Sequence, residues 1–228
     1  MIAKVLCDQI RQALPQVLEA RSDMRLKDDN SYVSAGDLLV QSIIIDWAGR
    51  HLPTHRIISE EMAQPEAPWE PNGSYVIIDP IDGTENFVSG LREWGVGVSV
   101  YTNGAHRESC IFLPELNDVQ ITGMAWRRHR SRIVGLSSSL SPKDVEELPW
   151  SRDVEFRIIG CAMYNLLMAA RGSFKVFENV NGVNCWDILP GLNLALEAGC
   201  QAWVDGAPYH GELLFPVKKY RVKIARGE

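Results

Sequence analysis

The sequence has few cysteines, and no two of them form a CxxC pair. The 228 residues include five cysteines, which are odd in number and scattered along the chain, at positions 7, 110, 161, 185 and 200. This usage argues against a disulfide framework. It predicts reduced thiols in a cytoplasmic protein, most of them buried as small apolar side chains.

Long apolar runs and basic runs are also scarce. No apolar stretch approaches the length of a membrane-spanning helix, and charged residues begin at Lys4, so we expect neither membrane association nor a signal peptide. The net charge is −6, and the main basic run is RRHR at 127–130, which argues against nucleic acid as a partner. An acidic protein that handles anions needs metal ions or helix N-termini to hold them.

Hydrophobic residues make up 46% of the chain, which is typical of an ordinary globular protein. Apolar periodicity predicts helices over 2–20, 35–50, 161–172 and 187–198. Short β-type runs predict strands over 55–58, 75–79, 94–101, 108–113, 118–126, 131–136, 154–159, 174–178, 200–204 and 220–225. Ser34 and Asp37 have the spacing of a capping box at the start of the second helix.

Four carboxylates lie where predicted strands end or helices begin. Glu60 follows the strand in IISEE, Asp79 and Asp82 follow the strand in IIDPID, and Asp187 opens a helix in NCWDILPG. In α/β proteins, catalytic and ligand-binding residues are concentrated at the ends of strands. If these four converge, each pair repels by roughly 4 kcal/mol at contact distance and an effective dielectric near 20. Hard divalent cations remove that repulsion, so the pattern predicts a Mg²⁺ site.

Each acidic residue also has a simpler interpretation. Asp82-Gly83 is a common turn signal, and Asp37 alone is more typical of a helix cap. Glu60 with its neighbour Glu61 could be a solvated pair, and Asp187 could serve the positive end of its helix. These interpretations are reasonable singly, but the four segments together match one known pattern in order.

The segments resemble the inositol monophosphatase family, the Mg²⁺-dependent, lithium-sensitive phosphatases of the fructose-1,6-bisphosphatase superfamily. DPIDGTENF (79–87) is similar to the family signature D-P-[IL]-D-G-T-x-N-F. WDILPGLNLALEAG (186–199), SEE (59–61) and KDDNSYVSAGD (27–37) resemble three further family segments. The resemblance implies an α/β (α+β) fold, a five-layer α-β-α-β-α sandwich of the sugar-phosphatase type, and a homodimer.

A weak boundary falls near 126–130, where the run of predicted strands ends in basic residues, and we expect two lobes in one integrated catalytic unit. The N-terminal α+β lobe, 1–126, would carry most metal ligands. The C-terminal α/β lobe, 127–228, would carry Asp187 and the substrate-side residues.

Metal ligands follow from the same resemblance. Glu60, Asp79 and the main-chain carbonyl of Ile81 would hold one Mg²⁺, and Asp79, Asp82 and Asp187 a second. A third, weaker ion would lie near Glu60 and its water. Two metals suit the reaction because one activates water and the other neutralises the leaving group.

Further roles are implied for the residues around these ligands. The catalytic residues would be Glu60 together with Thr84 and Asp37, in which the Thr84 hydroxyl passes a proton to Asp37. Glu61, Lys27 and Trp186 would surround the site, with Lys27 offsetting charge near Asp37. The substrate side would include Gly83, Thr84, Glu85, Cys161, Ala162, Glu178 and Asp187.

The substrate is less well defined than the reaction. The resemblance implies a small phosphate monoester, with inositol monophosphate or a related sugar or polyol phosphate first. Alternatives are adenosine 3′,5′-bisphosphate, fructose 1,6-bisphosphate and histidinol phosphate. A different class of function is a binding partner of the transcription machinery. Two departures concern specificity and metal geometry: Cys161 stands where Ser or Thr is usual, and Pro190 could shift the Asp187 carboxylate.

Overall fold

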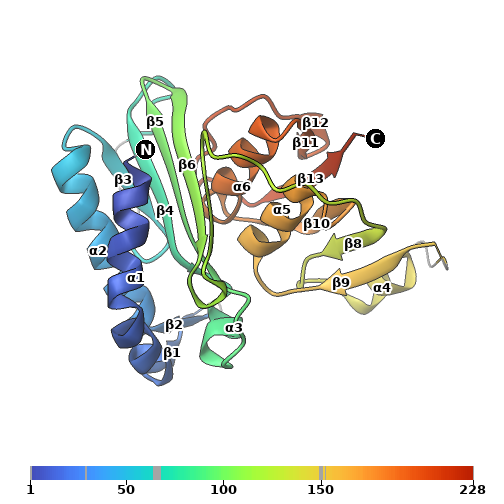
Figure 1. Cartoon of the computed structure of the whole chain (residues 1–228), viewed down its shortest axis with the longest axis horizontal. Coiled ribbons are helices and arrows are strands. Elements are labelled where there is room, and N and C mark those ends of the chain that lie inside the picture. Colours follow the sequence, from blue (N-terminus) through green and yellow to red (C-terminus); the bar gives the residue numbers. More distant parts are fainter. Residues whose placement is uncertain (1, 29, 64–67, 149–150, 152, 228) are drawn as a thin grey trace.

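The computed structural model describes residues 2–28, 30–63, 68–148, 151 and 153–227 (Figure 1). The first half contains α1 (Ala3–Glu19), a 3₁₀ turn (Ala20–Ser22), β1 (Met24–Leu26), β2 (Tyr32–Ser34), α2 (Ala35–His51), β3 (Arg56–Ser59), β4 (Tyr75–Asp82), α3 (Thr84–Val88), β5 (Gly95–Thr102), β6 (Ala105–Leu113), a 3₁₀ turn (Pro114–Leu116) and β7 (Asp118–Ile121). The second half contains β8 (Ile133–Leu136), α4 (Pro142–Glu146), β9 (Glu155–Ile158), α5 (Ala162–Arg171), β10 (Val176–Val183), α6 (Cys185–Glu197), β11 (Cys200–Val204), β12 (Ala207–Pro208) and β13 (Tyr220–Arg226).

Two large sheets organise the chain. The five-stranded sheet has the order β3-β4-β5-β6-β7, and the six-stranded sheet has the order β12-β11-β13-β10-β8-β9. In the first sheet β3 and β4 are parallel and the other pairs are antiparallel. The predicted boundary at 126–130 falls in the connection between β7 and β8, that is, between the two sheets.

The elements stack in five layers, α-β-α-β-α. Helices α1 and α2 cover one face of the five-stranded sheet, and α5 and α6 lie between the two sheets (Figure 1). The crossovers β8–α4–β9 and β9–α5–β10 run in opposite directions across the second sheet. Right-handed crossovers therefore place α4 and α5 on opposite faces. The fifth layer is thin: its helix in the described residues is the five-residue α4.

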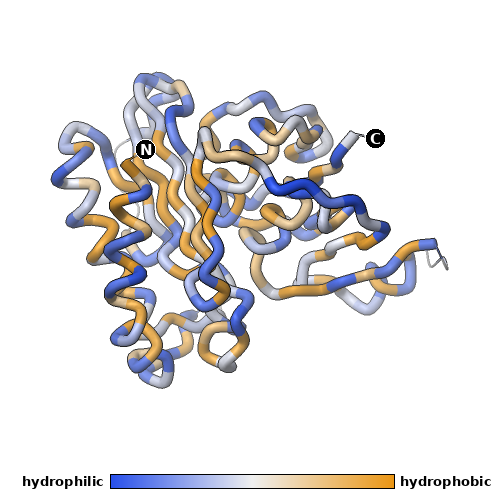
Figure 2. Tube along the Cα trace, viewed as in Figure 1, coloured by the Kyte–Doolittle hydropathy of each residue, from blue (hydrophilic) through white to orange (hydrophobic). Residues whose placement is uncertain are grey.

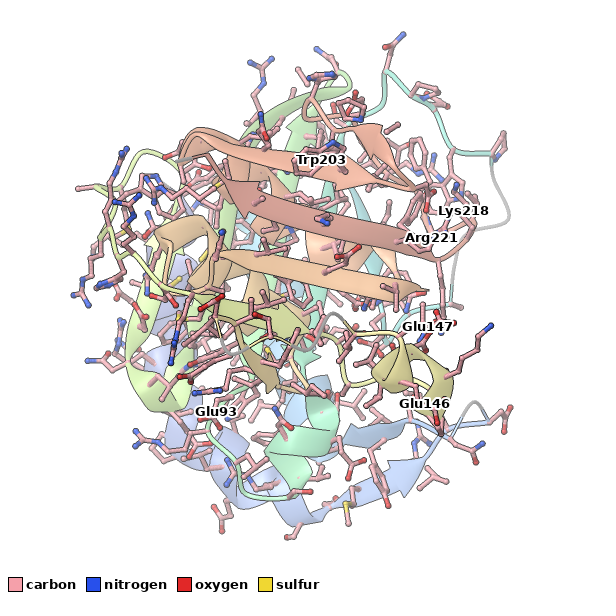
Figure 3. All side chains as sticks on the ribbon, turned by 90° about the vertical axis from the view of Figure 1, so that its right-hand side faces the viewer. Glu93, Glu146, Glu147, Trp203, Lys218 and Arg221 are labelled. Carbon is pink, nitrogen blue, oxygen red and sulfur yellow. The ribbon has the colours of Figure 1, made fainter. Side chains whose placement is uncertain are left out.

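The outer face of the six-stranded sheet is largely uncovered. Figure 3 looks onto this face and shows Trp203 and Arg221 on the neighbouring strands β11 and β13, with α4 at one end. The strands show the two-residue alternation expected of a sheet with one wet face. Along β13 the side chains of Tyr220, Val222 and Ile224 are buried, and those between them are more exposed.

The five-stranded sheet is buried on both faces. One apolar cluster joins it to α1 and α2, and another joins it to α5 and α6. All eight residues of β4 are buried. This explains why the run before Asp79 is almost continuously apolar, and Figure 2 shows these central strands as mainly hydrophobic. None of the helices in the described ranges is long and apolar enough to cross a membrane.

Most predicted elements are found, with differences that have physical causes. The capping box of Ser34 and Asp37 starts α2 as predicted. The strand predicted over 118–126 ends at Ile121, because the chain turns at Gly123, whose φ is +84°. The strand predicted over 174–178 continues to Val183 through a change of register. The short elements β1, β2, α3, α4 and β12 were not predicted, since two to five residues carry little periodicity.

Candidate metal centre

Asp79 and Asp82 lie at the end of β4, where the strand departs from regular pairing. Asp79 pairs with Gly97 of β5 and Asp82 pairs with Gly95, and the register shifts between them. The intervening Pro80 has no N–H to donate to a ladder. The irregularity puts both carboxyl groups at one end of a fully buried strand, with Asp79 0% exposed.

The structure brings three of the predicted acidic residues together. Glu60, Asp79 and Asp187 each offer a carboxylate oxygen within 4.8 Å of the others. Glu60 follows β3, which is parallel to β4, so both strands end at the same edge. Asp187 is the third residue of α6, and its Oδ2 accepts the N–H of Asn184 at 2.8 Å.

The donor set fits a divalent cation. Both oxygens of Asp79 are buried, and neither has a hydrogen-bond partner among the described residues. An ionised carboxylate without such a partner is costly to bury. Burial, followed by the charges of Glu60, Asp82 and Asp187, raises the pKa of Asp79 well above its usual value. Burial, followed by the charges of Glu60 and Asp82, raises the pKa of Asp187 well above its usual value, and burial raises the pKa of Glu60 to about 7. Carboxylate oxygens are the ligands that Mg²⁺ prefers, and a bound cation would remove these costs.

Asp82 lies in the same cavity, but α5 holds its carboxyl group. Its Oδ2 accepts the N–H of Met163 at 2.5 Å and the thiol of Cys161 at 3.1 Å. Burial raises the pKa of Asp82 to about 6, although these hydrogen bonds act in the opposite direction. Cys161, which stands where the family usually has Ser or Thr, therefore contacts a predicted metal ligand, Asp82.

Thr84 and Asp37 lie beside the carboxylates and within hydrogen-bond distance of each other. Thr84 Oγ1 is 3.3 Å from Asp37 Oδ1 and 3.0 Å from the carbonyl oxygen of Ile81. The preceding Gly83 has a φ of +82°, and a Cβ there would lie 2.9 Å from the Gly160 carbonyl. A side chain at this position would thus be strained twice, by its φ and by this contact.

Lys27 forms ion pairs with two acidic residues of the site. Its ammonium lies 2.9 Å from Glu60 and 2.7 Å from Glu61. Although burial opposes the shift, these two carboxylates raise the pKa of Lys27. Lys27 therefore holds Glu60 from the side while Glu60 faces Asp79.

The acidic residues line a cavity of about 280 Å³. Thr84, Gly83, Cys161 and Ala162 also line it, as predicted for the substrate side. Two predicted substrate residues are placed elsewhere: Glu85 is exposed on α3, and Glu178 forms an ion pair with Lys223 at 3.2 Å. Trp186 is not part of the lining and packs in the core between the sheets.

Sequence reasoning missed several polar residues that line this cavity. They include Ser137, Ser138, Ser139, Asn165, Asn179, Gly182, Asn184 and Lys219. The one available signal was the polar run SSS directly after the strand predicted over 131–136, since strand ends gather functional side chains. Lys219 carried no such signal.

Comparisons with known proteins identify the family of the chain. The sequence profile of the inositol monophosphatase family matches residues 2–212. The chain belongs to this family. A "Nus factor SuhB" of Pasteurella multocida is 28% identical over 79% of this chain and 75% of its own length. A "fructose-1,6-bisphosphatase/inositol-1-monophosphatase" of Thermotoga maritima is 29% identical over 72% of this chain and 67% of its own length.

A solved structure shows that the family fold extends over almost the entire chain. It is an IMPase/NADP phosphatase complexed with Mg²⁺ and phosphate, and it superposes with a TM-score of 0.81 at 18% identity. The match covers 99% of this chain and 90% of that one. The shared architecture is the five-layer arrangement described above, which confirms the predicted fold class.

Proposed function

We propose that the protein is a Mg²⁺-dependent phosphatase that hydrolyses a small phosphate monoester, of which inositol monophosphate or a related polyol phosphate is the first candidate. The observation that carries the proposal is the environment of the Asp79 carboxyl group. Its two buried oxygens have no donor in the described chain, and they face Glu60 and Asp187 beside the Thr84–Asp37 pair. A buried, multiply acidic centre of this kind is stable when it holds cations.

The ligand assignment comes from the resemblance to the family, and the grouping of Glu60, Asp79 and Asp187 supports it. Glu60, Asp79 and the carbonyl of Ile81 would hold one Mg²⁺, and Asp79, Asp82 and Asp187 a second. A third, weaker ion would lie near Glu60. When bound, the ions supply Lewis acidity, an activated water and neutralisation of the leaving group.

The chain's own groups orient and move the proton. Thr84 contacts both Asp37 and the Ile81 carbonyl, so its hydroxyl is held between the general base and the metal side. Asp37 accepts the proton that passes through Thr84. Burial raises the pKa of Asp37, which improves it as a base near neutral pH. Gly83 keeps the backbone clear of side-chain bulk where the phosphate enters.

The test is phosphate release from a panel of monoesters with and without Mg²⁺. The panel contains inositol 1-phosphate, fructose 1,6-bisphosphate, adenosine 3′,5′-bisphosphate, histidinol phosphate and glycerol 2-phosphate. We expect hydrolysis of at least one compound that EDTA abolishes and added Mg²⁺ restores. Activity that persists in EDTA would contradict the metal dependence, and no release from any compound would contradict the phosphatase proposal.

A second candidate function is binding to the transcription machinery, alone or in addition to catalysis. It is supported by the relatives named as Nus factors and by the basic segment 127–130, which is exposed. Figure 2 shows the connection between β7 and β8 as strongly hydrophilic. We expect that Arg127→Ala with Arg128→Ala weakens binding to purified RNA polymerase, measured by surface plasmon resonance, and leaves phosphate release unchanged. Equal binding by both proteins would remove this segment as the contact.

We also propose that the protein is a homodimer. Sedimentation equilibrium tests this, because a mass of one chain, 25.5 kDa, would contradict it.

A further inference from the structure

Two of the five cysteines meet in the core between α1 and the five-stranded sheet. The Sγ atoms of Cys7 on α1 and Cys110 on β6 lie 3.3 Å apart, although the two residues are 103 positions apart in sequence. Each of the two residues is 3% exposed. No other two thiols are in contact in the part of the chain that the structure describes. This pair lies outside the metal centre and does not line its cavity.

The alternation of side chains along β6 directs Cys110 toward α1. Cys110 and Phe112 belong to the apolar cluster that contains residues of α1 and α2, whereas Ile111 and Leu113 pack with residues of α5 and α6. Successive side chains of a strand point to opposite faces of the sheet. Cys7 is one of the buried residues of α1. The two thiols therefore face each other because of the helix and the strand that carry them.

Three regularly spaced contacts fix the position of α1 along β6. They pair Ala3 with Glu108, Cys7 with Cys110, and Arg11 with Phe112. Successive partners are four residues apart on the helix, a rise of about 6 Å, and two residues apart on the strand, a rise of about 6.6 Å. Because these rises nearly match, α1 lies along the strand, as Figure 1 shows for this sheet. The thiols are thus held opposite each other by a contact on either side.

The two thiols differ in their surroundings. Strand β6 is paired with β5 and β7, so Cys110 lies inside the sheet. Its hydrogen bond with Cys7 and its burial raise the pKa of the Cys110 thiol well above its usual value, so this thiol stays protonated near neutral pH. Cys7 lies on the first helix, whose outer side is exposed. Such a helix opens locally more easily than an inner strand, so we expect an oxidant to reach Cys7 first.

We propose that Cys7 and Cys110 form an oxidation site, at which hydrogen peroxide converts the two thiols into a disulfide that ties α1 to β6 and stabilises the fold. In the first step the Cys7 sulfur attacks the peroxide, the O–O bond breaks, and Cys7 becomes a sulfenic acid as water leaves. In the second step the Cys110 sulfur attacks the sulfenic sulfur. The S–S bond forms, the S–O bond breaks, and the hydroxyl group leaves with the thiol proton as water. The cysteine pair loses two electrons, and the peroxide gains them.

The geometry and the chain length both suit this bond. A disulfide holds its sulfurs about 2 Å apart, so the two thiols need to approach each other by about 1.3 Å. The bond would join residues 103 positions apart, and a long closed loop takes much conformational entropy from the unfolded chain. The inference does not depend on the proposed phosphatase function.

The experiment treats the folded, full-length protein with hydrogen peroxide and then counts its thiols. The samples are quenched, unfolded and alkylated, and intact mass spectrometry gives the number of alkylated cysteines. Digestion without reduction then identifies cross-linked peptides. The proteins are wild type, Cys7→Ala and the matched control Cys200→Ala. Cys200 is also buried, but its sulfur lies 3.7 Å from the Ala170 carbonyl oxygen and contacts no second thiol in the described chain. Thermal scans compare oxidised samples with samples reduced by dithiothreitol.

In wild type and Cys200→Ala we expect oxidation to remove two alkylatable thiols, to join the peptides of Cys7 and Cys110, and to be reversed by dithiothreitol. Oxidised wild type should melt about 5 °C or more above the reduced protein, as a disulfide closing a long loop gives in a chain of this size. Cys7→Ala should show neither the cross-link nor the shift.

Three results would overturn the inference. They are five alkylatable thiols in peroxide-treated wild type, a cross-link between other cysteines, and a Cys7–Cys110 cross-link without the rise in melting temperature. The peptide map and the thermal scans of wild type decide the outcome even if Cys7→Ala fails to fold.

Discussion

Thr84 donates its hydroxyl toward Asp37 Oδ1, while the other oxygen of Asp37 serves helix α2. Oδ2 accepts the N–H of Ser34 at 2.8 Å and its hydroxyl at 2.6 Å. The sequence leaves helix capping and proton relay in competition for Asp37. In the structure they use different oxygens of one carboxylate. Substitutions at Ser34 and at Thr84 can therefore separate the helix-capping role of Asp37 from its proposed role in proton transfer.

We predict opposite effects for Ser34→Ala and Thr84→Ala. Ser34→Ala removes the cap and should lower the free energy of unfolding by about 1 kcal/mol, with turnover changed only severalfold. Thr84→Ala should lower kcat by about 10²- to 10⁴-fold, the usual contribution of general acid–base catalysis, with little change in stability. Urea unfolding and phosphate release measure the two. Thr84→Ser, which keeps the hydroxyl, is the matched control, and a loss of Mg²⁺ binding in Thr84→Ala would instead make Thr84 structural.

Asp79→Asn should separate stability from metal binding. The substitution removes a buried carboxyl group that burial and neighbouring acidic residues make costly to ionise, so the metal-free variant should melt at a higher temperature than metal-free wild type. Added Mg²⁺ should stabilise wild type by about 2.7 kcal/mol at a hundredfold excess over its Kd. The variant should show almost none of this gain and no hydrolysis. Thermal scans with EDTA or Mg²⁺ measure both effects, with the exposed Asp46→Asn as control. A normal Mg²⁺ shift in Asp79→Asn would contradict the shared-ligand role.

The acidic centre could be predicted because its residues lie next to strong local signals. Asp79 and Asp82 follow a continuous apolar strand, and Asp187 opens a helix with clear periodicity. Parallel pairing of β3 with β4 then brings Glu60 to the same edge. Each step uses neighbours in sequence or adjacent strands, which local patterns describe well.

The other polar residues of the cavity lining could not be predicted, because contacts distant in sequence bring them there. Gly182 and Lys219 lie next to each other where the pairing of β10 with β13 shifts register, and such an irregularity has no periodic signature. Glu178 was expected on the substrate side from the resemblance alone. In the structure its neighbours Phe177 and Asn179 are buried, so the pleat of β10 turns Glu178 to the opposite face.

His106 should make stability depend on pH in the acid range. Burial lowers the pKa of His106 from 6.5 to about 4, and its ring bonds Ser109 Oγ at 2.8 Å. Between these values the unfolded chain binds a proton that the folded protein does not. Stability is thus fully present above about pH 6.5 and falls as the pH approaches 4. We expect a contribution of roughly 1–2 kcal/mol after discounting for solvent screening.

His106→Gln keeps a polar group for Ser109 and removes the titration. Its free energy of unfolding should fall less between pH 6.5 and 4 than that of wild type. Urea unfolding at half-unit pH steps measures the slope, and the exposed His210→Gln is the control. Parallel curves for wild type and His106→Gln would show that other groups cause the loss of stability between pH 6.5 and 4.

Lithium should inhibit hydrolysis through the position lined by Asp79, Asp82 and Asp187. Li⁺ is a small, hard cation that suits oxygen ligands but brings one charge too few, so it should trap the product phosphate. We expect uncompetitive or mixed inhibition on the order of millimolar Li⁺, as for weak single-charge binding to such a site. Steady-state kinetics at several Li⁺ concentrations, with Na⁺ at equal ionic strength as control, test this. Purely competitive inhibition, or equal effects of Na⁺, would contradict it.

The Leu189→Ala, Pro190→Ala double variant tests which residue sets the orientation of the Asp187 carboxylate at the Li⁺ position. The sequence suggested that Pro190 could turn the carboxylate, because proline fixes its own φ and lacks an N–H. In the structure Pro190 lies inside α6, and its Cγ would be 3.1 Å from a Cβ on Gly97, away from the cavity lining. Asp187 is held instead by the N–H of Asn184. We therefore expect the variant to lose stability by about 2–5 kcal/mol, as large-to-small core changes do, and to keep its Li⁺ inhibition constant within about twofold. A large rise in Li⁺ sensitivity would show that Pro190, and not Asn184, sets the orientation of Asp187.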